Sequence, residues 1–187
     1  MPTGEGGTGP IGGTRKVRNG WFRRIALALG LQLLAAASVC AQRGPTAEEY
    51  VKNVSGGARI VAAGELVLDG RKVSCGRRPT VLHNRLDDYG AAYQGFIILN
   101  PKRLEKVSTA VKLWTYAHEC GHQFRGPDEE VADCFAVQQG RRQGWLTAQG
   151  LEQVCRFIAR AKASSAHFAG PKRCRAMRVC YADRPVR

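Results

Sequence analysis

Apolar residues recur at helical spacing through the second half of the chain. The strongest such stretch is 109–124, which ends before a Gly-Pro pair that favours a break. A second helix is expected over 128–139, stopped by Gly140, and a third over roughly 147–162. The tail from Gly170 carries two cysteines and many arginines. We therefore expect a helical C-terminal half.

Shorter apolar runs lie ahead of these helices, after a short helix expected over 47–54. The β-prone runs are 58–63, 65–68, 71–75 and Phe96–Leu99. Asp69-Gly70 between two of them is a strong hairpin signal, whereas residues 80–95 show a mixed pattern. The sequence thus predicts an α+β fold, in which a small N-terminal β-sheet is followed by helices and a disulfide-tied helical C-terminus.

The N-terminal segment has the pattern of an export signal. Basic residues precede an apolar run over 25–39, and small residues follow it up to Ala41. The run is short for a membrane span, which needs about 20 residues. We expect residues 1–41 to be a cleaved signal peptide and 42–187 to be a single domain with no stable membrane span. A retained membrane anchor is the alternative.

Charge and cysteine content extend this interpretation. The 187 residues include 29 Lys and Arg against 15 Asp and Glu, a net charge of +14, which favours anionic surroundings such as nucleic acid or cell-envelope polymers. Export argues against nucleic acid as a partner. Without Cys40, six of the seven cysteines remain, an even number that predicts three disulfides in a periplasmic or extracellular protein. Their pairing stays open, and buried free thiols are the alternative.

His118-Glu119-Cys120-Gly121-His122 is an H-E-x-x-H motif inside the strongest predicted helix. Residues four apart share a helix face, so both imidazoles can point at one metal ion. Glu119 lies about 100° further round, where it can act on a water molecule as a general base. Cys120 faces away from the metal and suits packing or a disulfide. Two ordinary helix histidines paired with nearby acids are the alternative.

Acidic residues open the next predicted helix. Glu129 and Asp133 are again four residues apart, so one can bind the metal while the other accepts the ring N–H of a ligand histidine. Asp128 follows a proline and suits an N-cap. It is also the alternative third ligand, and its neighbour Glu130 has no acidic partner on its own face. The competing explanation for all these acids is stabilisation of a helix N-terminus.

The combination of H-E-x-x-H with the downstream E-x-x-A-D resembles the gluzincin zinc metallopeptidases, especially the prenyl-protein endopeptidase-like group. Residues 118–136 carry the resemblance. It implies His118, His122 and Glu129 as Zn²⁺ ligands, Glu119 as catalytic base and peptide-bond hydrolysis as the reaction. Asp133 then supports a ligand histidine. The insert between His122 and Glu129 is shorter than is usual in gluzincins, and in metzincins the third ligand would fall on Asp128.

Other site candidates are less defined. In zincins an edge strand ahead of the active helix pairs with the substrate backbone, and Gly95–Leu99 has the right place in the chain for that role; a plain core strand is the alternative. Four side chains are candidates for stabilising the oxyanion: His83, Tyr89, Tyr93 and Tyr116. The basic tail beyond residue 171 fits a solvated face better than a binding site.

These observations predict an exported zinc metallopeptidase that acts on peptide or protein substrates with a metal-activated water and Glu119 as general base. One alternative is a non-catalytic zinc-binding module. Another is a disulfide-stapled basic protein that binds anionic cell-envelope polymers.

Overall fold

The computed structural model describes residues 44–159 and 169–183. The expected signal peptide, residues 1–41, lies outside this part of the chain, as does the end of the helix expected over 147–162. The described residues form the predicted α+β fold, with the strands first and most of the helices after them. None of the described helices combines the length and the apolar character that a membrane crossing requires.

The main sheet has four short strands in the order β1 (Arg59–Val61), β4 (Thr80–Leu82), β6 (Phe96–Leu99) and β5 (Gly90–Tyr93). The β4–β6 pair is parallel and the other two are antiparallel. The predicted strand at 96–99 is confirmed as β6, but β4 and β5 arise in the stretch 80–95 that showed no clear pattern. All four β6 side chains are buried, as an interior strand requires.

The predicted hairpin is confirmed as β2 (Leu66–Leu68) and β3 (Arg71–Val73), which form a separate two-stranded sheet. The turn residues Asp69 and Gly70 have φ values of 47° and 81°. Only glycine and a few short polar residues adopt such values easily, which is why the Asp-Gly pair marks the turn.

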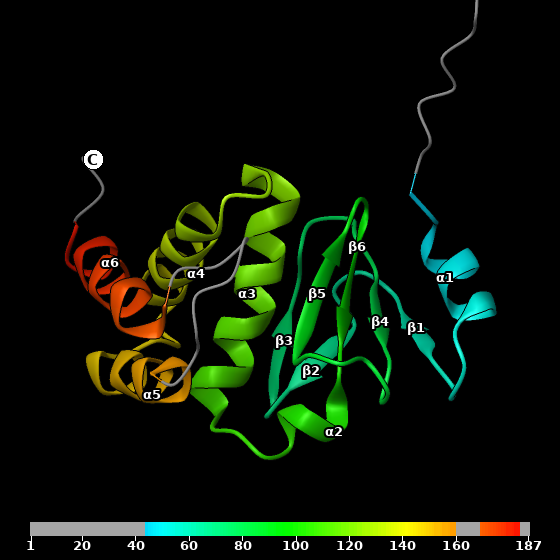
Figure 1. Cartoon of the computed structure of the whole chain (residues 1–187), viewed down its shortest axis with the longest axis horizontal. Helices are drawn as coiled ribbons and strands as arrows, with labels where there is room; N and C mark the ends of the chain where they lie inside the picture. The colour runs from blue at the N-terminus through cyan, green and yellow to red at the C-terminus, as the bar shows by residue number, and fades with distance from the viewer. Residues whose placement is uncertain (1–43, 160–168, 184–187) are drawn as a thin grey trace, which may run out of the picture. The chain divides into compact units, whose positions relative to one another are not determined.

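Six helices complete the described part: α1 (Ala47–Asn53), α2 (Pro101–Leu104), α3 (Thr109–Arg125), α4 (Glu129–Arg142), α5 (Ala148–Ile158) and α6 (Gly170–Ala182). The long helix α3 lies between the sheet and the helices α4, α5 and α6, whereas α1 lies beside β1 and β4 (Figure 1). The expected end of the second helix at Gly140 was wrong. A Cβ atom there would lie 2.7 Å from Leu146 and Trp145, so this glycine serves packing rather than helix termination.

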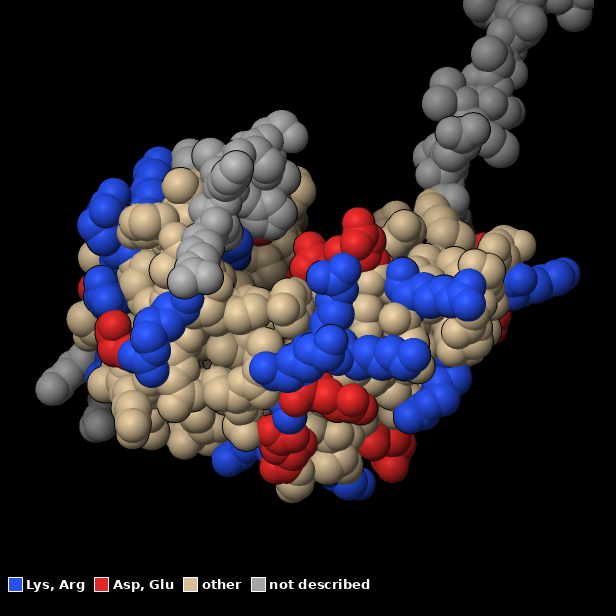
Figure 2. Space-filling model, turned by 60° about the horizontal axis from the view of Figure 1, so that its bottom comes forward, with Lys and Arg blue, Asp and Glu red and all other residues tan. Residues whose placement is uncertain are grey.

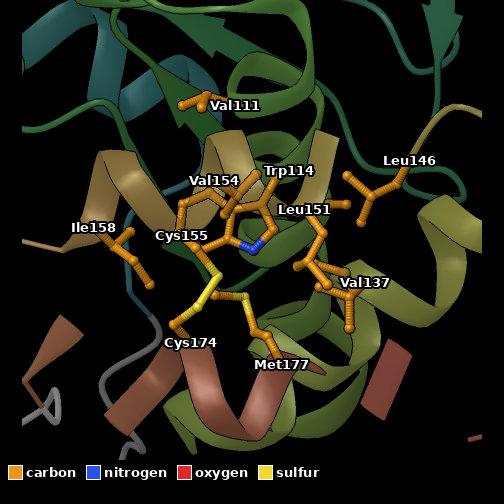
Figure 3. Close-up of a cluster of buried hydrophobic side chains, with 12 residues drawn as sticks. Val111, Trp114, Val137, Leu146, Leu151, Val154, Cys155, Ile158, Cys174 and Met177 are labelled. Atoms are coloured by element: carbon orange, nitrogen blue, oxygen red, sulfur yellow. A yellow bond between two sulfur atoms is a disulfide. The ribbon is translucent and has the colours of Figure 1, made fainter. Parts of the chain in front are cut away.

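The largest hydrophobic cluster joins the four C-terminal helices around the Trp114 indole of α3 (Figure 3). Val154 of α5, Val137 of α4 and Met177 of α6 are fully buried in it. Burial of each such side chain contributes about 1.5–3 kcal/mol. This cluster therefore fixes the positions of α4, α5 and α6 against the helix that carries H-E-x-x-H.

All six cysteines of the described residues are paired, which confirms the expected three disulfides. The pairs are Cys75–Cys120, Cys134–Cys180 and Cys155–Cys174. The first ties the segment after the hairpin to α3, and the other two tie α6 to α4 and to α5. Disulfides of this kind are typical of an oxidising compartment.

Candidate metal centre

Helix α3 presents both motif histidines toward α4. His118 is buried and His122 is half-buried, and their Nε2 atoms lie 3.2 Å apart. The ring Nδ1 of His122 lies 3.0 Å from the carbonyl oxygen of Gly126, which fixes that ring near the helix end. Gly126 ends α3 with φ 86°, a conformation that favours glycine, and the chain then turns into α4.

The two helices cross closely at Gly121. A Cβ atom added there would lie 3.0 Å from the backbone Cα of Ala132 and 3.2 Å from its carbonyl oxygen. Gly121 in H-E-x-x-H and Ala132 in E-x-x-A-D are therefore small because the two helices pack closely there. The sequence did not reveal this packing. This close approach brings Glu129 and Asp133, on the same turn of α4 as Ala132, within reach of the α3 histidines.

Glu129 completes a group that could hold a metal ion. Its Oε2 lies 3.1 Å from His118 Nε2, and its Oε1 lies 3.3 Å from His122 Nε2. The ligand atoms of the three residues all lie within 4.8 Å of one another. A tetrahedral ion with bonds of about 2.0–2.1 Å would hold neighbouring donor atoms about 3.3 Å apart. The donor spacing therefore fits such an ion.

Asp128, the alternative third ligand, has the expected capping role. It precedes α4, and its Oδ1 accepts a hydrogen bond of 2.9 Å from the backbone N–H of Val131. Its side chain satisfies one of the N–H groups that have no partner inside the helix. Glu130 is exposed on the same turn.

Asp133 supports His118 from behind. Its Oδ1 lies 2.9 Å from His118 Nδ1, within ion-pair distance, while Nε2 of the same ring faces Glu129. Asp133 is fully buried. Burial raises the pKa of its carboxyl, but hydrogen bonds from Arg173 and His118 outweigh this and hold the pKa below its usual value.

Arg173 of α6 is a site residue that the sequence analysis missed. It donates from Nε to Asp133 Oδ2 and from Nη2 to Oδ1, both at 2.8 Å, and it is 8% exposed. The tail was expected to be a solvated face, and for this residue that was wrong. Helical spacing could have identified it, because Arg173 lies on the same face of α6 as the other buried residues of that helix. The buried residues of α6 are Gly170, Arg173, Cys174 and Met177.

The same contacts shift the pKa values of both histidines upward. For His118, burial lowers the pKa, but the bonds with Asp133 and Glu129 raise it overall to about 9. For His122 the hydrogen bond with Glu129 is the main cause of the rise. Burial raises the pKa of Glu119, against the opposing effect of both histidines.

A cleft of about 740 Å³ opens beside these residues and is lined by His118, Glu119, His122 and Glu129 on one side and by β5 on the other. The strand at the edge of the sheet is β5, whereas β6 lies inside it. The interior alternative for Gly95–Leu99 was thus the right one. A Cβ atom at Gly90 would lie 2.9 Å from Glu119 Cγ, so glycine lets this edge strand approach Glu119.

Gln123 joins helix α3 to the turn after β5. Its Oε1 accepts from the Gly95 N–H at 3.0 Å and from Arg78 Nε at 3.1 Å, and its amide nitrogen donates to the carbonyl oxygens of Tyr93 and Phe96. All four hydrogen-bonding positions of this side chain are used. The edge strand is therefore held in register with the helix that carries the histidines.

Of the four oxyanion candidates, Tyr93 lines the cleft, and its ring also stacks on Phe96. The other three do not line the cleft and have structural partners elsewhere. The ring nitrogens of His83 lie within hydrogen-bonding distance of the Tyr50 hydroxyl and the Ser55 carbonyl oxygen. Tyr116 is buried in the core, and Tyr89 packs edge-on against Phe157.

Comparison with known proteins assigns no family. No protein-family model matches the chain, and no curated protein or solved structure matches it either. The functional assignment therefore depends on the geometry of the site itself.

Proposed function

We propose that this protein is an exported zinc metallopeptidase that hydrolyses peptide bonds. One observation carries the proposal: two imidazoles and a carboxylate converge at 3.1–3.3 Å on the floor of a cleft that also holds Glu119 and is bounded by an edge strand. The resemblance of residues 118–136 to the gluzincin metallopeptidases supports the same assignment. The disulfides support export.

His118, His122 and Glu129 would hold the metal. Two imidazole nitrogens and one carboxylate oxygen are a common ligand set for catalytic Zn²⁺, which keeps a further position open. When bound, Zn²⁺ acts as a Lewis acid that polarises a carbonyl and lowers the pKa of water. The Oδ1 of Asp133 lies 2.9 Å from His118 Nδ1, and this ion-pair contact would keep the lone pair of Nε2 directed toward the site.

Glu119 takes the proton of the attacking water and returns it to the leaving amine. It lines the cleft beside the histidines but is not one of the converging donors. Its raised pKa suits a group that must accept and release a proton in one cycle. A substrate in an extended conformation can pair with the outer edge of β5, which places its backbone beside Glu119.

The polymer-binding alternative has less support. On the face shown in Figure 2, basic side chains lie among acidic ones rather than in an uninterrupted patch. Two basic residues of α6, Arg173 and Arg178, are engaged in bidentate ion pairs within the chain. The positive charge therefore needs no polyanionic partner to explain those positions.

The experiment is a comparison of Glu119→Gln with the unchanged protein. Hydrolysis of fluorescently labelled casein should fall by about 10²–10⁴-fold, because the general base is lost. Elemental analysis should still find one Zn²⁺ per chain. The matched control is Glu130→Gln, at an exposed carboxylate on the first turn of α4, which should retain full activity. A Glu119→Gln protein that remains active would contradict the proposed mechanism, and one that loses zinc would make Glu119 a ligand. Zinc without any activity in the unchanged protein would favour a non-catalytic module.

A further inference from the structure

Arg173 is a buried cation that pairs with the carboxylate behind a candidate metal ligand. Its side chain comes from α6, forty residues after Asp133 in the chain, and both of its hydrogen bonds to that carboxylate are 2.8 Å long. The Asp133 oxygen that accepts from Nη2 is also the one that lies 2.9 Å from His118 Nδ1. A continuous chain of contacts thus runs from α6 through Asp133 to the histidine.

A second contact joins the same residues through Trp114. The guanidinium carbon of Arg173 lies 5.6 Å from the centroid of the indole ring, and that ring lies 5.4 Å from the ring of His118. Trp114 precedes His118 by four residues and shares its helix face. Arg173 therefore touches both groups that hold the His118 ring, one by hydrogen bonds and one by packing.

Both members of the ion pair have a disulfide next to them in the sequence. Cys134 follows Asp133 and is bonded to Cys180, and Cys174 follows Arg173 and is bonded to Cys155. Helix α6 is thus fastened to α4 at one end and to α5 near its other end. The cluster around Trp114 and Met177 fills the space between them (Figure 3).

We infer that Arg173 is a positioning residue for the metal centre, held in place by the disulfide-tied helix α6, so that tight metal binding requires α6 to be fastened. The inference rests on the proposed metal site. The guanidinium holds both Asp133 oxygens in a fixed plane, as a bidentate arginine does. One oxygen is thereby aimed at His118 Nδ1, which keeps the ring in the orientation and tautomer that present Nε2 to the metal.

The test compares two arginines of the same helix. Arg178 also forms a bidentate pair, with Glu152, but that pair is exposed and joins α6 to α5 rather than to Asp133. Zn²⁺ affinity is measured by chelator competition for the unchanged protein, Arg173→Met, Arg173→Lys and Arg178→Met. We expect Arg173→Met to weaken Zn²⁺ binding about 10–100-fold, the range for residues that orient a ligand. Arg173→Lys should restore only part of the affinity, since lysine keeps the charge but not the planar fork, and Arg178→Met should bind as the unchanged protein does.

A second measurement separates positioning from stability. The visible spectrum of bound Co²⁺ reports ligand geometry, and it should change in Arg173→Met but not in Arg178→Met. Replacing both Cys155 and Cys174 with alanine should lower Zn²⁺ affinity as well. Adding Arg173→Met to that variant should cause little further loss, because both changes act through the same contact.

The outcomes are distinct. If the unchanged protein binds Zn²⁺ and Arg173→Met binds it equally well with the same Co²⁺ spectrum, the inference is wrong and the proposed function stands. If Arg173→Met does not fold, an unchanged affinity in Arg173→Lys overturns the inference and a weakened one supports it. If the unchanged protein binds Zn²⁺ but cleaves no peptide, the proposed peptidase falls while the role of Arg173 is still decided by these variants. No Zn²⁺ binding at all would overturn both.

Discussion

Replacement of Gly121 by alanine should weaken metal binding, because it disturbs the close crossing of α3 and α4. The added methyl group would lie 3.0 Å from Ala132 Cα and 3.3 Å from its Cβ, so α4 must move away from α3 by a few tenths of an ångström. Metal–ligand distances tolerate only about ±0.2 Å. Since Glu129 and Asp133 move with Ala132, Zn²⁺ affinity should fall by about 10–100-fold, as it does when ligand orientation is disturbed.

The effect on the unfolding free energy should be limited because two terms oppose each other. Overpacking costs about 1–3 kcal/mol, and alanine is favoured over glycine inside a helix by about 1 kcal/mol. The metal-free variant should therefore lose no more than about 2 kcal/mol of unfolding free energy. Urea unfolding without metal and chelator competition with Zn²⁺ measure the two quantities separately.

Gly150→Ala is the matched control, since it makes the same change inside α5. Its new methyl group would meet side-chain atoms of Ala110 and Leu146 at 3.3 Å, away from the metal ligands. Its Zn²⁺ affinity should be unchanged. If Gly121→Ala binds Zn²⁺ as tightly as this control does, the close crossing of α3 and α4 does not set the ligand geometry and the reasoning fails.

Four further predictions concern the third ligand, the edge strand, the thiols and acid stability. Glu129→Ala should reduce Zn²⁺ affinity as severely as loss of a histidine, whereas Asp128→Ala should keep the metal and lose about 1 kcal/mol of unfolding free energy as a missing cap; the opposite pattern would make Asp128 the ligand. Gln123→Glu removes two hydrogen-bond donors at the turn after β5 and should raise the KM for peptides without changing Zn²⁺ affinity, so an unchanged KM would contradict its role. Thiol titration of the denatured, unreduced protein purified from an oxidising compartment should find no free thiol among the six paired cysteines, and six thiols would refute the pairing. Hydrogen bonds from Lys112 and Thr109 hold the pKa of Asp69 below its usual value of about 3.9. The ionised carboxylate therefore contributes its full stabilisation at pH values above about 3.9. That contribution is lost as the pH falls through the lowered pKa. The unfolding free energy of Asp69→Asn, measured by urea unfolding at pH 2–5, should therefore depend less on pH than that of the unchanged protein. The same pH dependence in both proteins would contradict this prediction.

The converging donors could be predicted because their placement depends on local geometry. Helical periodicity alone puts His118 and His122 on one face and Glu129 and Asp133 on another. Only a short break separates the two helices, so few alternatives exist for how they meet. The cap of α4 was predictable for the same reason, because the preference of Asp128 for an N-cap depends on its immediate neighbours.

The edge strand could not be predicted, because its signal is weak over so few residues. Strand β5 is Gly90–Tyr93 and begins with glycine and two alanines, which have low β-propensity. It exists because β6 offers a buried partner and because Gly90 fits against α3 at Glu119. Tertiary contacts of this kind produce no periodic pattern of apolar residues in the sequence. The interior position of β6 follows from the same unpredicted strands β4 and β5.

The support of the metal centre is non-local, unlike its ligands. The histidines and Glu129 lie within twelve consecutive residues. In contrast, the Asp133 carboxylate behind His118 is held by Arg173, which lies forty residues after Asp133 in the chain. Closing so long a loop costs conformational entropy, and the two disulfides of α6 reduce that cost by limiting the unfolded chain. Burial of the Arg173–Asp133 ion pair also costs desolvation free energy, which is offset only when the geometry of the two hydrogen bonds is good. Two of the disulfides that indicate an oxidising compartment also secure the arginine behind a candidate metal ligand. The compartment in which the protein can fold is thereby linked to how its candidate site is built.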